Sequence, residues 1–326
     1  MKFGILCKIS DYRKKIGQGL KNIHFIHEAI YSPHKSGLHN GEKFVHFLNM
    51  REGNRNIFEL LNSGQPTMIA RHGATELEVA VSFDWEYSIS GLDTLCFNGG
   101  FFPNDKELAE DWAELYLESS REIDCLCDYH HKWGRYSKIQ HLFSKYSPNA
   151  TLINDLNVIN PFFIKKPWTR YLRGKRVLII SPFVDTIKSQ YKKRKNLFAD
   201  EDILPDFESL SCVKAVQTSA GNEDSRFNTW FEAYEYMLDE IRQKEFDVAL
   251  VSCGAYGLPL AAQIKKMGKQ AVLMGGSLQL LFGIRGSRWD DKQHWISRGL
   301  FNEHWVRPSK SEKPEKAGDV EDSAYW

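Results

Sequence analysis

Apolar and polar positions alternate in blocks along the second half of the chain. Short, continuously apolar runs predict strands at residues 175–181, 213–217, 247–252 and 270–274. Helical spacing of apolar residues predicts helices between them, at residues 184–195, 225–244 and 258–267. Continuous apolar strands that alternate with helices are typical of a parallel sheet that is covered on both faces. The pattern therefore predicts an α/β fold, a Rossmann-like and mostly parallel sheet with helices on both faces.

The first half shows the same alternation more weakly. Short strands are predicted at residues 68–70, 123–127 and 150–153, and helices from residue 76 (with Thr75 as a cap), at 105–122 and at 137–145. From these patterns we divide the chain into four parts. They are a basic, helical amino-terminal extension (1–60), an α/β domain (61–308) with sub-halves 61–160 and 161–308, and a charged, poorly ordered tail (309–326).

Composition narrows the function classes. The net charge is +1, so no overall field favours nucleic acid as a partner. The sequence has no apolar run long enough to span a membrane. Its six cysteines lack the spacing of a zinc site and are expected to be reduced thiols of a cytoplasmic protein. Residues 11–23 combine basic and apolar positions and predict either an amphipathic helix on an anionic membrane or a solvated basic arm.

Glycines follow two of the predicted strands. In an open parallel sheet, ligands bind beyond the carboxyl ends of the strands, and a helix start there points free N–H groups at a phosphate. The candidate nucleotide-binding residues at these two ends are Gly254, Tyr256 and Gly257 after the first strand, and Gly275, Gly276 and Ser277 after the second. The alternative is that the glycines only shape the turns. The G-x-x-G spacing without a following acidic ribose ligand argues against a dinucleotide site.

Two charged residues lie near these strand ends. Arg285 follows the second glycine pair, and its guanidinium fork suits a diphosphate, although a surface arginine is an equal alternative. Asp185 follows the strand at 175–181 and is interpreted as a helix cap or, less simply, a catalytic base.

The densest polar cluster of the first half is RHGATE, residues 71–76, at the end of the strand 68–70. Its Glu76 has the chemistry to bind a metal, hold a sugar hydroxyl or act as a base. Asn98, in the glycine-rich loop NGGFFP (98–103), is a candidate hydrogen-bonding residue, and Trp85 and Tyr87 are candidates for stacking on a sugar or base.

Three segments resemble the bacterial GT-D glycosyltransferases, which assemble surface polysaccharides and glycoprotein glycans. RHGATE (71–76) resembles the R-x-G-D-x-E stretch of that family. The segment 98–127 resembles its middle region, and residues 251–276 resemble its glycine turn, helix and following strand. The family's aspartate is replaced by Ala74, whereas Glu76 is retained.

The resemblance implies a GT-D-like fold and a hexosyltransferase-like enzyme. It would transfer a sugar from a nucleotide-diphosphate sugar, UDP-linked in our interpretation, to a growing bacterial surface glycan such as capsule. Glu76 and Arg71 would be catalytic, and Gly73, Asn98 and the two glycine turns would bind the donor. The acceptor would be a lipid-linked glycan presented at the inner face of the plasma membrane.

The resemblance also raises the question of a metal. Mn²⁺ or Mg²⁺ would be held by Glu76, the diphosphate and water, or the enzyme would work without a metal and use arginine to neutralise the diphosphate. The loss of the aspartate at position 74 supports the main alternative, a non-catalytic nucleotide-sugar-binding or regulatory protein of the same pathway. A sugar-phosphate isomerase or a methyltransferase also uses glycine turns in a parallel sheet.

Overall fold

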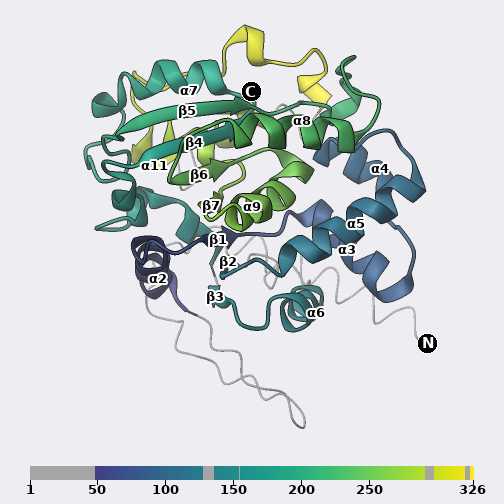
Figure 1. Cartoon of the computed structure of the whole chain (residues 1–326). Helices are drawn as coiled ribbons and strands as arrows, with labels where there is room; N and C mark the ends of the chain where they lie inside the picture. The colour runs from purple at the N-terminus through teal and green to yellow at the C-terminus, as the bar shows by residue number, and fades with distance from the viewer. Residues whose placement is uncertain (1–47, 128–135, 154, 291–296, 320–323) are drawn as a thin grey trace, which may run out of the picture. The chain divides into compact units, whose positions relative to one another are not determined.

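A single seven-stranded sheet organises the chain (Figure 1). The structure is a computed structural model that describes residues 48–127, 136–153, 155–290, 297–319 and 324–326. The strands are β1 (Thr67–Ala70), β2 (Cys125–Cys127), β3 (Thr151–Ile153), β4 (Arg176–Ser181), β5 (Ser209–Lys214), β6 (Val248–Val251) and β7 (Gln270–Leu273). Their order is β3-β2-β1-β7-β6-β4-β5, and every neighbouring pair is parallel. The predicted α/β fold class is confirmed.

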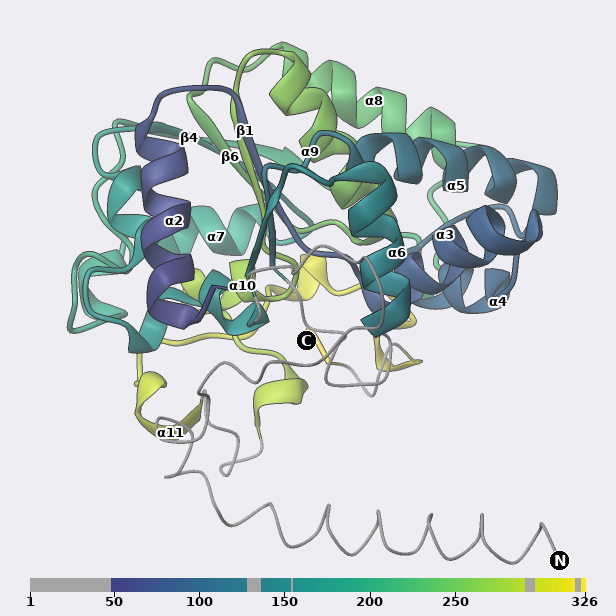
Figure 2. The same ribbon diagram turned by 90° about the horizontal axis from the view of Figure 1, so that it is seen from below.

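Helices cover both faces of this sheet, as predicted. They are α2 (Met50–Asn62), α3 (Ala74–Glu86), α4 (Leu92–Thr94), α5 (Lys106–Ser120), α6 (Tyr136–Tyr146), α7 (Val184–Tyr191), α8 (Trp230–Arg242), α9 (Gly257–Lys266), α10 (Ser277–Leu281) and α11 (Ser297–Leu300). Helices α3, α5, α6, α8 and α9 lie on one face, and α2, α7 and α10 lie on the other (Figure 2). The right-handedness of the connections between parallel strands explains why the helices lie on two faces. Connections that run in opposite directions across the sheet place their helices on opposite faces.

The two predicted sub-halves share one sheet. Strand β1 of the first sub-half pairs with β7 of the second, with Thr67 opposite Gln270 and Ile69 opposite Val272. Gln270 adds three side-chain bonds, accepting from the Tyr171 hydroxyl and donating to the carbonyls of Leu61 and Gln65. The two sub-halves are therefore joined by hydrogen bonds within the buried core.

The predicted edge strand is displaced along the sequence. The strand expected at 213–217 is β5 at Ser209–Lys214. An edge strand has one neighbour and a solvated side, so only Val213 of β5 is fully buried and the strand has no continuous apolar run. The predicted cap of α3 is also wrong, because Gly73 is the N-cap and Thr75 is already within the helix.

The prediction that the carboxy-terminal tail is poorly ordered is wrong for its described residues. It contains two short 3-10 helices, Lys310–Glu312 and Ala317–Asp319, and buries Glu312, Ala317 and Trp326. The Glu312 carboxylate accepts hydrogen bonds from the backbone N–H of Asp185 at 2.7 Å, from Thr186 and from the Ser309 hydroxyl. Negative charge at a helix start is favourable, so Glu312 caps α7 from a distant part of the chain.

Replacing Glu312 with alanine is expected to destabilise the protein by about 2–4 kcal/mol, because several buried donors then lose their acceptor. Urea unfolding checks this value. Glu315→Ala is the matched control from the same segment, since Glu315 is exposed and makes no hydrogen bond or ion pair with other described residues. Its effect is expected to stay within about 0.5 kcal/mol. Equal effects of the two changes would show that Glu312 is not a cap.

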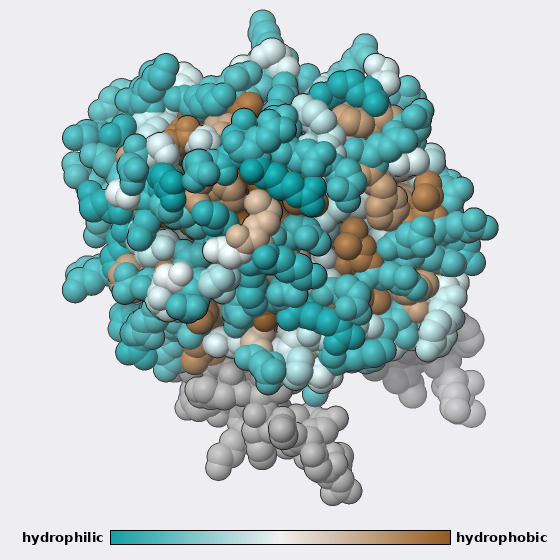
Figure 3. Space-filling model, viewed as in Figure 1, coloured by the Kyte–Doolittle hydropathy of each residue, from teal (hydrophilic) through white to brown (hydrophobic). Residues whose placement is uncertain are grey.

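One face of the domain is mostly polar. The face drawn in Figure 3 is largely hydrophilic, with apolar side chains in small, separate groups. Across the part of the chain that the structure describes, no helix has the length and apolarity to cross a membrane. The predicted amphipathic segment 11–23 lies outside the described residues.

Candidate functional site

The carboxyl ends of β1, β7, β6 and β4 lie side by side at one edge of the sheet. The connection from β4 runs to β5, whereas the connection from β6 runs to β7 on the other side, so the winding reverses between β4 and β6. Ligands of open α/β sheets bind outside the carboxyl ends near such a reversal. The predicted site residues come from the loops at this edge.

Arg71 and Gly275 meet between β1 and β7. Gly275 has a φ of +57°, and a Cβ added to it would lie 2.6 Å from Nη1 of Arg71. The guanidinium therefore rests directly on the glycine backbone, and only glycine permits this approach. Nη2 of Arg71 donates to the carbonyl of His72 at 3.3 Å, and Nε is buried without a hydrogen-bond partner among the described residues. The arginine thus retains unused donor capacity.

The Glu76 carboxylate folds back over the loop that precedes it. A Cβ on Gly73 would lie 1.9 Å from Oε2 of Glu76, and a Cβ on Gly99 would lie 3.8 Å from Oε1. Burial raises the pKa of Glu76 above its usual 4.5, against the opposing effects of its own backbone N–H and the positive charge of Arg71. Glu76 is thus a carboxylate with raised basicity next to a cation, which is the arrangement of a candidate general base.

The raised pKa has a consequence for stability. A carboxyl that binds its proton more tightly in the folded state loses stability as pH rises from about 4.5 through its folded pKa. Glu76→Gln removes this loss, so the variant is expected to be more stable than the wild type at pH 8 and equally stable at pH 4. Thermal unfolding across this range measures the difference. A variant that is less stable at pH 8 would show that the carboxylate is held by favourable interactions instead.

Tyr116 and His72 are buried residues of the candidate site. The tyrosine was not identified as a site residue from the sequence. Nδ1 of His72 lies 2.9 Å from the Tyr116 hydroxyl, and both side chains are buried. Burial, followed by the negative charge of Glu76, raises the pKa of Tyr116. Tyr116 lies on the apolar face of α5, so its sequence spacing indicated only a core residue. It is a positioning residue for the 71–76 loop.

The glycine turn after β6 packs against the loop that contains Asn98. Gly254 has a φ of +55°, and a Cβ there would lie 2.7 Å from the Gly99 carbonyl oxygen. Asn98 itself lies in a π-helical turn, Leu95–Gly99, which is a local geometry frequent at functional sites. The glycine turn therefore brings the 98–100 loop to Glu76, which is a role in addition to any contact with a ligand.

The other two predicted residues of this turn are packed into the core. A Cβ on Gly257 would lie 2.6 Å from a methyl group of Leu273, so this glycine lets α9 approach β7. The Tyr256 ring is buried and stacks on Trp230 with ring centroids 4.7 Å apart. That ring face is not open to a nucleotide base, and the Tyr256 hydroxyl is buried as well.

The second glycine turn lies under aromatic side chains. A Cβ on Gly276 would lie 3.1 Å from the ring of Tyr325 and 3.5 Å from that of Trp289. Ser277 begins α10, which is only five residues long. The Arg285 guanidinium lies over the Phe301 ring at 6.0 Å. Gly275 is therefore the member of this group that the structure brings to Arg71.

The residues at this edge do not make a complete metal site. Glu76 is the only acidic residue in the 71–76 loop. No group of three potential side-chain ligands occurs among the described residues. Divalent ions of the Mg²⁺ type need several oxygen ligands, and the 71–76 loop supplies only one carboxylate for them.

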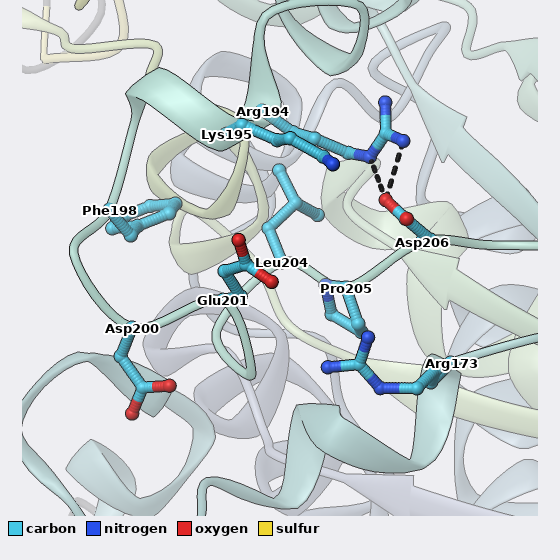
Figure 4. A pocket seen from close by; sticks show the side chains of 9 residues that line it. All are labelled: Arg173, Arg194, Lys195, Phe198, Asp200, Glu201, Leu204, Pro205 and Asp206. Atoms are coloured by element: carbon cyan, nitrogen blue, oxygen red, sulfur yellow. Dashed lines mark hydrogen bonds and ion pairs between the residues drawn. The ribbon is translucent and has the colours of Figure 1, made fainter.

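A small cavity lies at the opposite edge of the sheet. Figure 4 shows its lining residues, among them Arg173, Arg194 and Asp206. These residues precede β4 and β5, at the amino ends of the strands. The cavity holds about 10 Å³, which is room for about one water molecule. It is too small for a nucleotide sugar and lies at the wrong edge of the sheet.

Comparisons with known proteins find only low sequence identity and low structural similarity. No protein-family model matches the sequence, and no curated protein matches it. A solved domain of unknown function 1792 is 15% identical and superposes with a TM-score of 0.43, over 80% of this chain and 94% of its own. A structure described as a new glycosyltransferase from Streptococcus sanguinis is 14% identical, with a TM-score of 0.41 over 72% of this chain and 82% of its own.

A third structure is described as the highly conserved domain of unknown function 1792 with a distinct glycosyltransferase fold. It is 16% identical and has a TM-score of 0.42 over 80% of this chain and 94% of its own. At identities and TM-scores this low, the likenesses do not establish a shared activity. The α/β class of this chain follows from its own parallel sheet and helices.

Proposed function

We propose that the chain is a glycosyltransferase that moves a sugar from a nucleotide-diphosphate sugar to a hydroxyl of a glycan acceptor. The observation that carries the proposal is the pairing of Arg71 and Glu76 at the carboxyl edge of β1, beside Gly275 of the neighbouring strand end. A cation with unused donors and a carboxylate of raised pKa are the two groups that this transfer needs.

Each group has one role in the proposed reaction. A bond forms between the acceptor oxygen and the anomeric carbon, while the bond from that carbon to the diphosphate oxygen breaks. Glu76 takes the proton of the acceptor hydroxyl, since its raised pKa makes it a better base than a free carboxylate. The diphosphate leaves with the bonding electrons, and the Arg71 fork neutralises its growing charge.

The finer parts of the proposal rest on the resemblance of residues 71–76 to the R-x-G-D-x-E stretch. They are a UDP-linked donor, a growing bacterial surface glycan as acceptor, and work in the cytoplasm at the inner face of the plasma membrane. The donor diphosphate would lie against Gly73, Asn98 and the glycine turns after β6 and β7. Because the described residues near Glu76 form no group that could hold a metal ion by themselves, no step of the proposed mechanism uses one.

A second candidate is a non-catalytic nucleotide-sugar-binding protein. Glu76 is the third residue of α3, where a glutamate commonly reaches back to the start of its own helix. Its carboxylate does fold back over Gly73, so a purely structural role is consistent with the same geometry. The two candidates differ in turnover and not in binding.

Hydrolysis and transfer assays across a panel of UDP-, GDP-, dTDP- and CMP-linked sugars test the proposal. We expect slow hydrolysis of at least one donor by the wild-type protein, with release of the nucleoside diphosphate. Binding of a donor without turnover, with or without acceptor, would favour the second candidate. The absence of both turnover and binding for every donor would contradict both candidates.

A further inference from the structure

A large groove lies beyond the carboxyl end of β5, apart from the Arg71 and Glu76 pair. Its volume is about 770 Å³, within the range of small-molecule sites. Three parts of the chain line it: the end of β5 and the loop after it, residue Tyr236 on α8, and residues 314–316 of the carboxy-terminal tail. It lies at the same edge of the sheet as the candidate active site.

The walls of this groove are fixed by hydrogen bonds. The Lys316 ammonium donates to the Gly221 carbonyl at 2.9 Å, and its backbone N–H donates to the Asn222 side chain at 3.2 Å. The Arg226 guanidinium makes two bonds to the Asp224 carboxylate, at 2.9 and 2.6 Å, and lies over the Tyr236 ring at 5.0 Å. The tail and the loop therefore form one pre-organised wall.

Several polar groups of the groove remain unused. The side chains of Gln217, Lys214, Glu223 and Glu315 line it and make no hydrogen bond or ion pair with other described residues. Tyr236 is 39% exposed, which places it among the few exposed aromatic residues of the described part of the chain. An exposed ring beside unpaired amide and charged groups offers both stacking and hydrogen bonds to a ligand.

The charges of the groove indicate the class of ligand. Lys214, Arg226 and Lys316 balance Glu223, Asp224 and Glu315, so the groove has no net charge to attract a phosphate. Three carboxylates in the lining would repel one. A neutral, polyhydroxylated ligand suits this lining, because its hydroxyls both donate and accept and its apolar ring faces can stack on an aromatic side chain.

The groove is connected to the candidate active site by direct contacts. The Thr218 hydroxyl, in the loop that forms the groove wall, donates to the Gly100 carbonyl at 2.6 Å. The adjacent Gly99 lies next to the Glu76 carboxylate. One short connection therefore joins the groove lining to the proposed base.

We propose that this groove binds the non-reacting sugars of a neutral glycan acceptor. The assignment to an acceptor rests on the proposed transferase function, whereas glycan binding by the groove does not. Sugars held there would be positioned by Tyr236 and Gln217 while the terminal hydroxyl of the glycan reaches Glu76.

Saturation-transfer NMR and calorimetry with the full chain and a panel of neutral tri- and tetrasaccharides test this proposal. We expect at least one oligosaccharide to bind the wild type. Tyr236→Ala is expected to weaken it about tenfold through the loss of stacking, and Gln217→Ala to weaken it severalfold. Tyr236→Phe keeps the ring and is expected to bind within about twofold of the wild type. Gln65→Ala removes an exposed glutamine outside the groove, as a match for Gln217→Ala, and should have no effect.

The outcomes separate this proposal from the proposed function. Glycan binding that Tyr236→Ala weakens, in a protein that turns over no donor, would keep the groove assignment and reject the transferase. No oligosaccharide binding by the wild type would overturn the groove assignment, whatever the donor assays show. Weaker UDP binding in Tyr236→Ala, with glycan binding unchanged, would also overturn it and assign the groove to the nucleotide.

Discussion

Replacing Glu76 with glutamine is expected to lower the rate of sugar transfer by about 10²- to 10⁴-fold, the usual contribution of a general base. Glutamine has the same shape and can still reach back to the start of α3, so the loop should keep its structure. What it loses is the ability to take the acceptor proton. Affinity for the nucleoside diphosphate is expected to stay within about twofold, as measured by calorimetry beside the transfer rate.

Glu52→Gln is the matched control for this change. Glu52 occupies the same third position of α2 and completes a capping box with Asn49, on the opposite face of the sheet from α3. It is expected to leave the transfer rate unchanged. If Glu76→Gln also leaves the rate unchanged, Glu76 is only a helix cap, and the proposed base is wrong.

Replacing Arg71 with methionine is expected to lower kcat/KM for the donor by about 10²- to 10³-fold, because the leaving diphosphate loses its neutralising charge. Arg71→Lys should recover part of this loss, since lysine restores the charge but not the two-pronged geometry. The loss should appear in the binding of UDP and not in that of uridine, which lacks the diphosphate. Titrations with both ligands make this distinction.

A pH profile supplies an independent readout for Arg71. Its positive charge lowers the pKa of Glu76, so removing it lets that pKa rise further. A base must be deprotonated to act, and the acidic limb of the rate profile should therefore move to higher pH in Arg71→Met. Arg194→Met removes a cation from the opposite edge of the sheet and should leave the profile in place. An equal shift in both variants would indicate a general charge effect.

The sequence predicted the inner strands of the sheet well for a physical reason. Strands β4, β6 and β7 are buried on both faces, so each is a continuous apolar run that stands out from its neighbours. Strand β5 at the edge has mixed exposure, and its position was wrong. The prediction for the tail was wrong for a related reason. The tail is rich in charged residues, and composition alone does not show that Glu312 is buried, because its burial depends on hydrogen-bond donors near residue 186.

The candidate site was only partly predictable. The positions of Arg71, Glu76 and Gly275 at strand ends could be inferred from the pattern, and the structure brings them together. The contact between Gly254 and Gly99 could not be inferred, because the two residues are distant in sequence. Tyr256 and Tyr116 also show the limit, because spacing alone does not tell which of two buried tyrosines lies beside a reactive carboxylate.

A crystal structure of the protein with UDP would test the central claim most directly. The account predicts that the diphosphate lies within hydrogen-bonding distance of the Arg71 guanidinium, beside Gly275 and facing Glu76. A diphosphate bound in the groove beside Tyr236 or at the amino edge of the sheet, with Arg71 untouched, would contradict it.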